Sequence, residues 1–423
     1  MTDPTRDRLG RLGVSVPEIL LPRPGVDLFQ WAVIACDQHT SEPDYWEEVE
    51  RIVGDRPSTL HMIYPEVYLG EPNPDARIGR IHETMQRYLD ERIVESAGES
   101  MILTIRGTPH VSERRGLMLA LDLDQYDYHP DAESLTRATE QTIVERIPPR
   151  VRIREGAALE VPHVMVLIDD ADDELFGGLL GSDLDRLYAT QLMLGGGQVS
   201  GYRLDDAAIE HVAATLERLL ERSSAPHPFL FAVGDGNHSL ATAKAVWDGM
   251  KEECPPDHPA RFALVEVVNL YDPGLRFEPI HRLVQTNDPS SWVNDLAAAI
   301  GGEQNECSQE ELRSALQEDS ARVGFLTGDR CGYVTRTASR ELPVSAVQSY
   351  INERSDISVD YIHGWDTSVQ LGRRPSSVVV VLPEFDPRLL YPTVAKRGVL
   401  PRKAFSLGEA EEKRYYLEAR RIS

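Results

Sequence analysis

Short hydrophobic runs of strand length alternate along the chain with segments of helical periodicity. An apolar run of about four to eight residues bounded by turn residues is typical of a buried strand. Buried strands are therefore predicted at "WAVIACD" (31–37), "SMILTIRGT" (100–108), "GLMLALDLDQY" (116–126), "PHVMVLIDD" (162–170), "PFLFAV" (228–233) and "SSVVVVLPEF" (376–385).

Other segments place apolar residues three and four positions apart, which is the spacing of one face of a helix. This spacing predicts helices over 44–53, 74–95 and 207–222. Ser41, Glu42 and Pro43 suit the entry to the first of these, because proline is tolerated in a first turn. The mixture of strands and helices predicts a mixed α+β protein.

The chain has 423 residues, which is more than one hydrophobic core usually supports. We expect three parts: an N-terminal α/β domain over 1–130, a core over 131–288 that holds a strand–turn–helix, and a C-terminal α/β segment over 289–423 that packs back on the core. The last part carries helical patterns such as "SQEELRSALQ", where Ser308 can cap a helix together with Glu311.

Composition and charge narrow the classes of function. Acidic residues number 69 against 44 basic ones, for a net charge of −25, and such a surface repels nucleic acid and anionic membranes. No apolar run has the length of a membrane span and the first residues do not resemble a signal peptide, so a cytoplasmic location is expected. The four cysteines form no CxxC pair. Cys36 is either a reactive thiol or a small buried hydrophobe.

The stretch "FLFAVGDGNHSLATAKAVW" (229–247) predicts a buried strand, a tight turn and a helix. Asn237 or Asp235 can cap that helix, while Gly234 and Gly236 let the backbone approach a ligand closely. His238 and Ser239 add a side-chain donor each. The start of such a helix attracts anions such as phosphate, but an ordinary capped turn explains the same residues. The pattern is neither GxxxxGK[ST] nor GxGxxG.

Basic residues elsewhere are candidates to hold a phosphate. Arginine binds phosphate oxygens with two parallel hydrogen bonds, although each of these residues is equally explained by surface ion pairs. The candidates are Arg137, Arg146 and Arg150, interleaved with Glu140 and Glu145; His281 and Arg282, expected just after a strand; and Arg402 and Lys403.

Acidic residues follow the first predicted strand. Asp37, His39 and Glu42 come at its end, where carboxylates serve as a general base or as magnesium ligands. Capping of the next helix by Asp37 or Ser41 is the structural alternative. The triple glycine 195–197 indicates either a hairpin turn or a lid hinge. Histidines 39, 238, 281 and 363 leave a metal-dependent hydrolase open, but no HExxH or HxH spacing occurs.

Taken together, the motifs resemble the domain-of-unknown-function 1015 family of bacteria and archaea. They are "WAVIACDQHTSEPDYW", "ATEQTIVERIPPR", "LMLGGGQVSGY", "VGDGNHSLATAKA", "PIHRLV", "YIHGWD" and "LPRKAFSLGEAEEKRYYLEARRI", in that order. The "DGNHS" loop is also similar to the "DGHHR" loop of free-serine kinases, which share a fold with the partition protein ParB and sulfiredoxin. This resemblance implies a ParB/sulfiredoxin-like mixed-sheet core with flanking helices and additional domains.

The resemblance also implies roles for individual residues. It places Gly234, Asp235, Gly236, Asn237, His238 and Ser239 at a nucleotide, and it makes Asp37, with Glu42 second, the counterpart of a carboxylate that takes the proton of a substrate hydroxyl. The chain departs from the kinase loop because Ser239 replaces its arginine. Arg137, Arg146, Arg282 or Lys403 is expected to supply the missing cation. His39, Thr40, Glu140 and Thr142 are expected to contact the substrate.

The resulting hypothesis is a phosphotransferase that uses ATP or ADP with Mg²⁺ on a small hydroxylated metabolite, with free L-serine as the first guess. Its partners would be the substrate and the nucleotide alone. Two alternatives remain: a nucleotide-binding switch or partner-binding protein without turnover, and a metal-dependent hydrolase. The sequence does not predict the oligomeric state.

Overall fold

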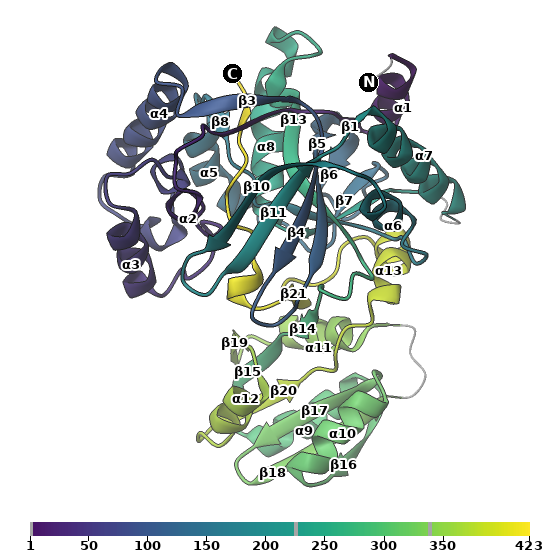
Figure 1. Cartoon of the computed structure of the whole chain (residues 1–423). Helices are drawn as coiled ribbons and strands as arrows, with labels where there is room; N and C mark the ends of the chain where they lie inside the picture. The colour runs from purple at the N-terminus through teal and green to yellow at the C-terminus, as the bar shows by residue number, and fades with distance from the viewer. Residues whose placement is uncertain (1–2, 224–226, 337–340) are drawn as a thin grey trace. The chain divides into compact units, whose positions relative to one another are not determined.

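The structure is a computed structural model that describes residues 3–223, 227–336 and 341–423 (Figure 1). It divides into two compact units. Unit 1 comprises residues 1–275, 394–398 and 409–423, and unit 2 comprises 276–393 and 399–408. Of the three segments expected from the sequence, 1–130 and most of 131–288 therefore fall together in unit 1. Strands and helices are both abundant in each unit, which confirms the α+β class.

Unit 1 contains a ten-stranded mixed sheet in which β1 pairs with β5 beside the path β10-β11-β4-β5-β13-β9-β12-β7-β6. Pairing is parallel for β13 with β9, β12 with β7 and β6 with β7, and antiparallel elsewhere. Its strands are β1 (Val14–Ser15), β4 (Ile102–Gly107), β5 (Arg114–Asp122), β6 (Tyr126–Asp127), β7 (Thr136–Ala138), β9 (Met165–Ile168), β10 (Asp185–Leu192), β11 (Gly197–Arg203), β12 (Phe231–Asp235) and β13 (Phe262–Asn269).

Both faces of this sheet are covered. Side chains alternate between the faces along each strand, and β5 shows the alternation: Leu117, Leu119 and Leu121 enter one core and Met118 enters the other. The first core is completed by helices α1 (Asp3–Arg11), α6 (Glu174–Leu180), α7 (Asp206–Arg222) and α8 (Asn237–Met250). The second is completed by α2 (Leu28–Trp31), α3 (Pro43–Val53), α4 (Pro74–Asp90) and the segment 415–422. Smaller elements of unit 1 are α5 (Ile147–Arg154) and the strand pairs β2 (Glu18–Pro22) with β3 (Val94–Glu99) and β8 (Leu159–Glu160) with β22 (Arg420–Arg421).

Unit 2 has a six-stranded antiparallel sheet in the order β16-β18-β17-β20-β15-β19. The strands are β15 (His281–Gln285), β16 (Gly302–Glu306), β17 (Arg322–Thr327), β18 (Arg330–Arg336), β19 (Ser358–Ile362) and β20 (Ser377–Val381), with the separate pair β14 (Phe277–Pro279) and β21 (Phe405–Leu407). Its helices are α9 (Pro289–Ala299), α10 (Gln309–Glu318), α11 (Pro343–Asn352) and α12 (Trp365–Gly372), and α13 (Leu390–Arg397) contributes residues to both units. The capping box of Ser308 and Glu311 at the start of α10 confirms that prediction.

The predicted strand over 31–37 is wrong. Residues 28–31 form the short helix α2, and the buried segment after it makes only an isolated bridge between Ile34 and Tyr415. The segment lies against the C-terminal stretch, where Ala35 N donates to Arg414 O over 2.8 Å and Tyr416 N donates to Val33 O over 2.8 Å. Burial of a hydrophobic run therefore did not require it to join a sheet. Among the described residues, no helix combines the length and apolar character that crossing a bilayer needs.

Candidate functional site

The predicted strand, turn and helix around "GDGNHS" are confirmed as β12 and α8. The predicted cap is wrong: Gly236, in the left-handed region at φ 77°, is the N-cap of α8, and no side chain makes a capping hydrogen bond there. Asp235 Oδ1 instead accepts the N–H of Gly236 over 2.9 Å. A Cβ at position 236 would lie 3.0 Å from Val164 Cα, so glycine also allows the close approach to the next segment. The helix thus begins without a side-chain cap, as an anion-binding helix does.

The carboxylate at the end of β12 forms an ion pair with a residue from the C-terminal segment. Lys413 Nζ lies 3.1 Å from Asp235 Oδ2, and the side chains are 10% and 27% exposed, respectively. Burial raises the pKa of Asp235, but Lys413 and then His163 outweigh this effect, so its pKa lies below the usual value. Lys413 therefore brings a cation to the turn that lacks the arginine of the kinase loop.

His163 connects this pair to Asp37. His163 Nδ1 lies 2.8 Å from Tyr416 Oη, which accepts the N–H of Cys36 over 3.0 Å. His163 Nε2 lies 3.9 Å from Asp37 Oδ2, a separation that one bridging oxygen atom can span. His163 also lowers the pKa of Asp235, so Asp37 and Asp235 belong to one electrostatic cluster.

A second ion pair lies beside Cys36. Arg150 Nε donates to Glu66 Oε1 over 2.9 Å, and Glu66 N donates to Cys36 O over 2.8 Å. Burial raises the pKa of the Cys36 thiol above its usual range, and the charges of Asp37 and Glu66 raise it further. Cys36 is therefore a protonated thiol, which favours its interpretation as a small packing residue over that of a nucleophile. Arg150, one of the predicted phosphate-binding candidates, is therefore held in an ion pair with Glu66 next to the cluster.

At the first turn of α8, the predicted residue His238 contacts the segment that holds another predicted residue, Thr142. Ile143 N donates to His238 Nε2 over 3.2 Å, which joins the segment after β7 to the helix. Thr142, the preceding residue, is 9% exposed, and its Oγ1 has no hydrogen-bond partner. Asn237 Oδ1 is likewise buried without a partner. Buried polar atoms are normally paired, so each of these two oxygens can still take a polar partner.

The remaining residues of the Asp37 loop are more exposed. His39 Nδ1 lies 3.1 Å from Glu42 Oε1, and its ring stacks on Tyr45 with centroids 3.7 Å apart. The Glu42 side chain is 63% exposed and Thr40 is exposed. Glu42 is the N-cap of α3 without a side-chain hydrogen bond, so neither Asp37 nor Ser41 caps that helix. Asp37 therefore does not have the helix-capping role that was the structural alternative.

Most of the predicted phosphate-binding cations are engaged elsewhere. Arg137 is 4% exposed on β7, and its guanidinium donates to Ser134 O and His227 O. Arg146 is exposed in the 3₁₀ turn before α5, and Glu140, half-buried, follows β7. His281 and Arg282 come just after a strand, as predicted: they follow β14 and are the first two residues of β15.

Arg282 and Lys403 belong to unit 2. Arg282 is fully buried and donates to Ile280 O, Gln348 Oε1 and Arg402 O, so its donors serve the local fold. Lys403 is exposed, with φ 60°. His281 Nδ1 accepts the N–H of Leu382 over 3.1 Å. Lys413, which no sequence argument selected, is the cation found at the turn.

The triple glycine is the turn of the hairpin β10–β11. Gly195 and Gly197 have φ 80° and 77°, which suits glycine, and a Cβ at Gly196 would collide with the ring of Tyr415. Arg106 Nη2 donates to Gly196 O over 2.7 Å, and its guanidinium lies 5.0 Å from the centre of the Tyr415 ring. The hairpin interpretation explains all three glycines.

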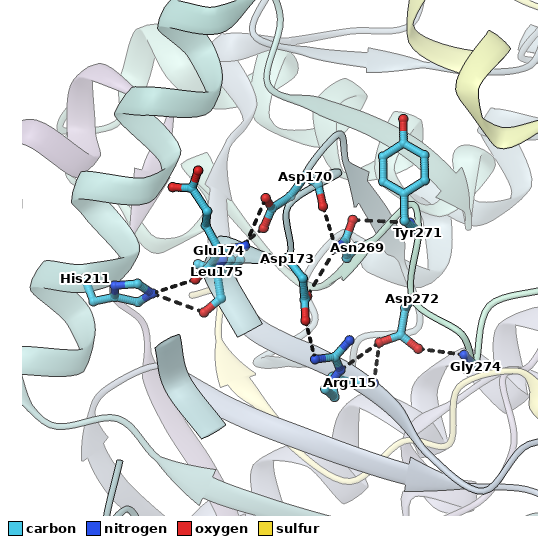
Figure 2. A network of polar contacts seen from close by, with 10 residues as sticks. All are labelled: Arg115, Asp170, Asp173, Glu174, Leu175, His211, Asn269, Tyr271, Asp272 and Gly274. Carbon is cyan, nitrogen blue, oxygen red and sulfur yellow. Dashed lines mark hydrogen bonds and ion pairs between the residues drawn. The ribbon is translucent and has the colours of Figure 1, made fainter. Parts of the chain in front are cut away.

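A second polar network lies at the opposite end of β9 (Figure 2). Asp170 accepts the N–H groups of Glu174 and Leu175 and so holds the start of α6, while Arg115 bridges Asp173 over 2.7 Å and Asp272 over 3.0 Å. These groups satisfy one another, and we interpret the network as structural. Among the described residues, no group of three or more His, Cys, Asp or Glu side chains is arranged to hold a metal ion.

Sequence reasoning missed Lys413 and His163. Lys413 lies within the quoted motif "LPRKAFSLGEAEEKRYYLEARRI", and His163 is the second residue of the predicted strand over 162–170. Both were visible as polar residues beside buried segments. Their proximity to Asp235 depends on the antiparallel pairing of Met165 with Asp235 and on the C-terminal segment, which no local pattern encodes.

No match was found among curated protein sequences. Solved structures with some similarity include a conserved hypothetical protein from Pyrococcus furiosus (10% identity, 72% of this chain and 95% of that one, TM-score 0.36). Others are a free serine kinase in complex with AMP (9% identity, 71% and 90%, TM-score 0.39) and a C-terminally truncated SbnI from Staphylococcus aureus (12% identity, 69% and 82%, TM-score 0.38). TM-scores this low assign no function. The family model described as "Protein of unknown function (DUF1015)" matches residues 20–354, and the chain belongs to that family.

Proposed function

We propose that this protein is a nucleotide-dependent phosphotransferase that acts on a small hydroxylated metabolite, with free L-serine as the first substrate to test. The observation that carries the proposal is the pairing of Lys413 with Asp235 at the start of α8, one histidine away from Asp37. This arrangement combines a cation, a helix start and a carboxylate, which are the parts that phosphoryl transfer needs.

The residues at the turn fit a nucleotide phosphate. The start of α8 carries partial positive charge, Gly236 keeps the backbone accessible, and the ammonium of Lys413 brings a full positive charge to the turn. Thr142 Oγ1 and Asn237 Oδ1 are buried polar atoms that a ligand would satisfy. A magnesium ion bound with the nucleotide would neutralise phosphate charge, and Asp37 and Asp235 carry the oxygen atoms that such an ion prefers.

Asp37 is the proposed general base. The acceptor hydroxyl would bridge Asp37 Oδ2 and His163 Nε2, whose separation of 3.9 Å suits one shared oxygen atom. As the acceptor oxygen attacks the terminal phosphorus, the bond from that phosphorus to the departing nucleotide oxygen breaks. The hydroxyl proton passes to the Asp37 carboxylate, and His163 orients the hydroxyl by donating to it. The products are a phosphomonoester and the shortened nucleotide.

The test measures binding and transfer separately. Thermal stability is recorded with ATP, ADP and CTP, with and without Mg²⁺, and phosphoserine formation is then assayed with the nucleotide that stabilises the protein. We expect Lys413→Met to weaken nucleotide binding at least tenfold and Asp37→Asn to abolish transfer while binding persists. Lys251→Met, which removes the same charge at the far end of α8, should leave both unchanged. Equal behaviour of Lys413→Met and Lys251→Met would contradict the proposal.

A nucleotide-binding switch is the second candidate. The observation in its favour is that Lys413 and Asp235 are already paired with each other, as residues with a structural role would be. Under this alternative, a nucleotide binds and depends on Lys413, but no acceptor receives a phosphoryl group and Asp37→Asn has no effect on the bound nucleotide.

A further inference from the structure

Two cysteines of unit 2 face each other across neighbouring antiparallel strands. β16 pairs with β18 in a register that ends with Glu306 opposite Gly332, so the next pair in that register is Cys307 opposite Cys331. The backbone confirms the pairing, because Cys307 N donates to Cys331 O over 3.2 Å. β16 is an edge strand of the six-stranded sheet, so its end is joined to only one neighbouring strand.

The two side chains lie on the same face of the sheet. Both pack against the core cluster of unit 2 that includes Leu312 and Leu326. Cys331 Sγ donates to Cys307 O over 2.7 Å, which places this sulfur atom directly over its partner residue. Opposed residues have Cβ atoms about 4.5–5.5 Å apart, and a disulfide needs about 3.5–4.5 Å. A small shift at the end of an edge strand closes that difference.

Solvent access and local charge decide how the pair reacts. All four cysteines of the chain are free, and Cys307 and Cys331 are both half-buried. Burial raises the pKa of each thiol; Cys331 and Glu311 raise that of Cys307 further, and Glu306 and Glu311 raise that of Cys331. Because the thiolate is the nucleophile, oxidation at neutral pH is slow and accelerates as the pH rises.

We propose that Cys307 and Cys331 are a reversible redox pair that is oxidised by small-molecule disulfides such as oxidised glutathione. One thiolate attacks the small disulfide, forming a mixed disulfide and releasing one thiol. The second cysteine then attacks the protein sulfur of the mixed disulfide and releases the second thiol. The protein loses two electrons and two protons, and the small disulfide gains them. A bond that spans a slightly long Cβ separation is readily reduced, so the pair is suited to switching between states.

The test uses the whole chain and measures, for each cysteine, whether its thiol can still be alkylated. The protein is equilibrated with oxidised glutathione, unfolded, alkylated with iodoacetamide and analysed as intact mass and as peptides. We expect the wild type and Cys254→Ser to lose two alkylatable thiols, recovered with dithiothreitol, and a linked peptide to contain Cys307 and Cys331. Cys307→Ser and Cys331→Ser should form no linked peptide.

Three results would overturn the proposal. They are full alkylation of Cys307 and Cys331 after oxidation at pH 9, a glutathione adduct that persists on either residue, and a linked peptide that involves Cys36 or Cys254. If a serine variant does not fold, the proposal is tested by the wild type alone, through the presence or absence of a peptide that links Cys307 and Cys331. Faster oxidation at higher pH is expected, and a rate independent of pH would contradict the role assigned to the thiolate.

Discussion

Lys413 Nζ and Asp235 Oδ2 lie 3.1 Å apart, although one belongs to the C-terminal segment and the other ends a strand in the middle of the chain. The pair joins two segments of unit 1 that are far apart in the sequence, and both charges are partly buried. A buried charge that loses its partner is costly, whereas loss of both charges is often tolerated. The pair therefore has a consequence for stability that does not depend on the bound ligand.

We expect Lys413→Met and Asp235→Asn each to lower the free energy of unfolding by about 1–3 kcal/mol, and the double variant to lose less than the sum by about 1–2 kcal/mol. Urea denaturation of the four proteins measures this coupling. The pair Lys244–Asp248, more exposed on the same helix, is the control and should show a coupling of roughly 0.3–0.5 kcal/mol. Additive losses for Lys413 and Asp235 would show that the two charges do not interact.

Glu266 makes the free energy of unfolding of unit 1 fall at acidic pH. Burial raises the pKa of this carboxyl, but Arg414, Arg114 and the hydroxyl of Thr104 outweigh burial and lower it from 4.5 to about 2. Because the folded-state pKa is lowered, the stabilisation is present above about pH 4.5 and is lost as the pH falls toward 2. The loss amounts to about 3 kcal/mol. Denaturation between pH 2 and 6 should show this slope in the wild type and a smaller one in Glu266→Gln. The exposed control Glu221→Gln should behave as the wild type does.

His281 gives unit 2 a pH dependence in a higher range. Burial, then His363 and Arg282, lower the pKa of His281 from 6.5 to about 4, and its Nδ1 accepts the N–H of Leu382. The stabilisation from the neutral ring is complete above about pH 6.5 and is lost as the pH falls through 4. NMR titration of the imidazole protons should place the His281 midpoint near 4. A midpoint near 6.5 would show that the ring is accessible to solvent.

Two glycines of the hairpin turn allow the cost of backbone strain to be measured apart from the cost of a steric collision. Gly195 and Gly197 both have positive φ, but a Cβ at Gly195 would meet no atom within 4 Å, whereas a Cβ at Gly197 would collide with the backbone of Gly107. We expect Gly195→Ala to cost about 1 kcal/mol and Gly197→Ala at least about 2–3 kcal/mol in the free energy of unfolding. Equal losses in urea denaturation would mean that the turn relaxes around position 197.

Local patterns predicted the elements better than they predicted the site. The helices α3, α4, α7 and α10 followed from apolar spacing and capping residues, because both signals lie within one turn or a few turns of chain. The run over 31–37 was assigned to a strand because it is apolar. In the structure its neighbour is another extended segment, around Tyr415, which the run itself does not specify.

In the candidate site, too, the residues set by local sequence could be predicted and those brought in by distant segments could not. Asp235 and the start of α8 were identifiable because the turn is local, and Asp37 was identifiable because it follows a buried run. Lys413 and His163 were not, because they reach the turn through the pairing of β9 with β12 and through the C-terminal segment. Arg137 and Arg282 were selected for their charge, but burial commits their donors to backbone carbonyls.

The first and last segments of unit 1 are translated at different times, because unit 2 lies between them in the sequence. Residues 409–423 belong to unit 1, yet the whole of unit 2 is translated between residue 275 and these residues. The nascent sheet of unit 1 therefore emerges with the groove for Tyr415 and Tyr416 unfilled and with Asp235 lacking its lysine. Domains tend to fold as they are synthesised, so unit 2 can complete its own core first. Residues 409–423, which are translated after unit 2, are then the ones that complete the earlier unit.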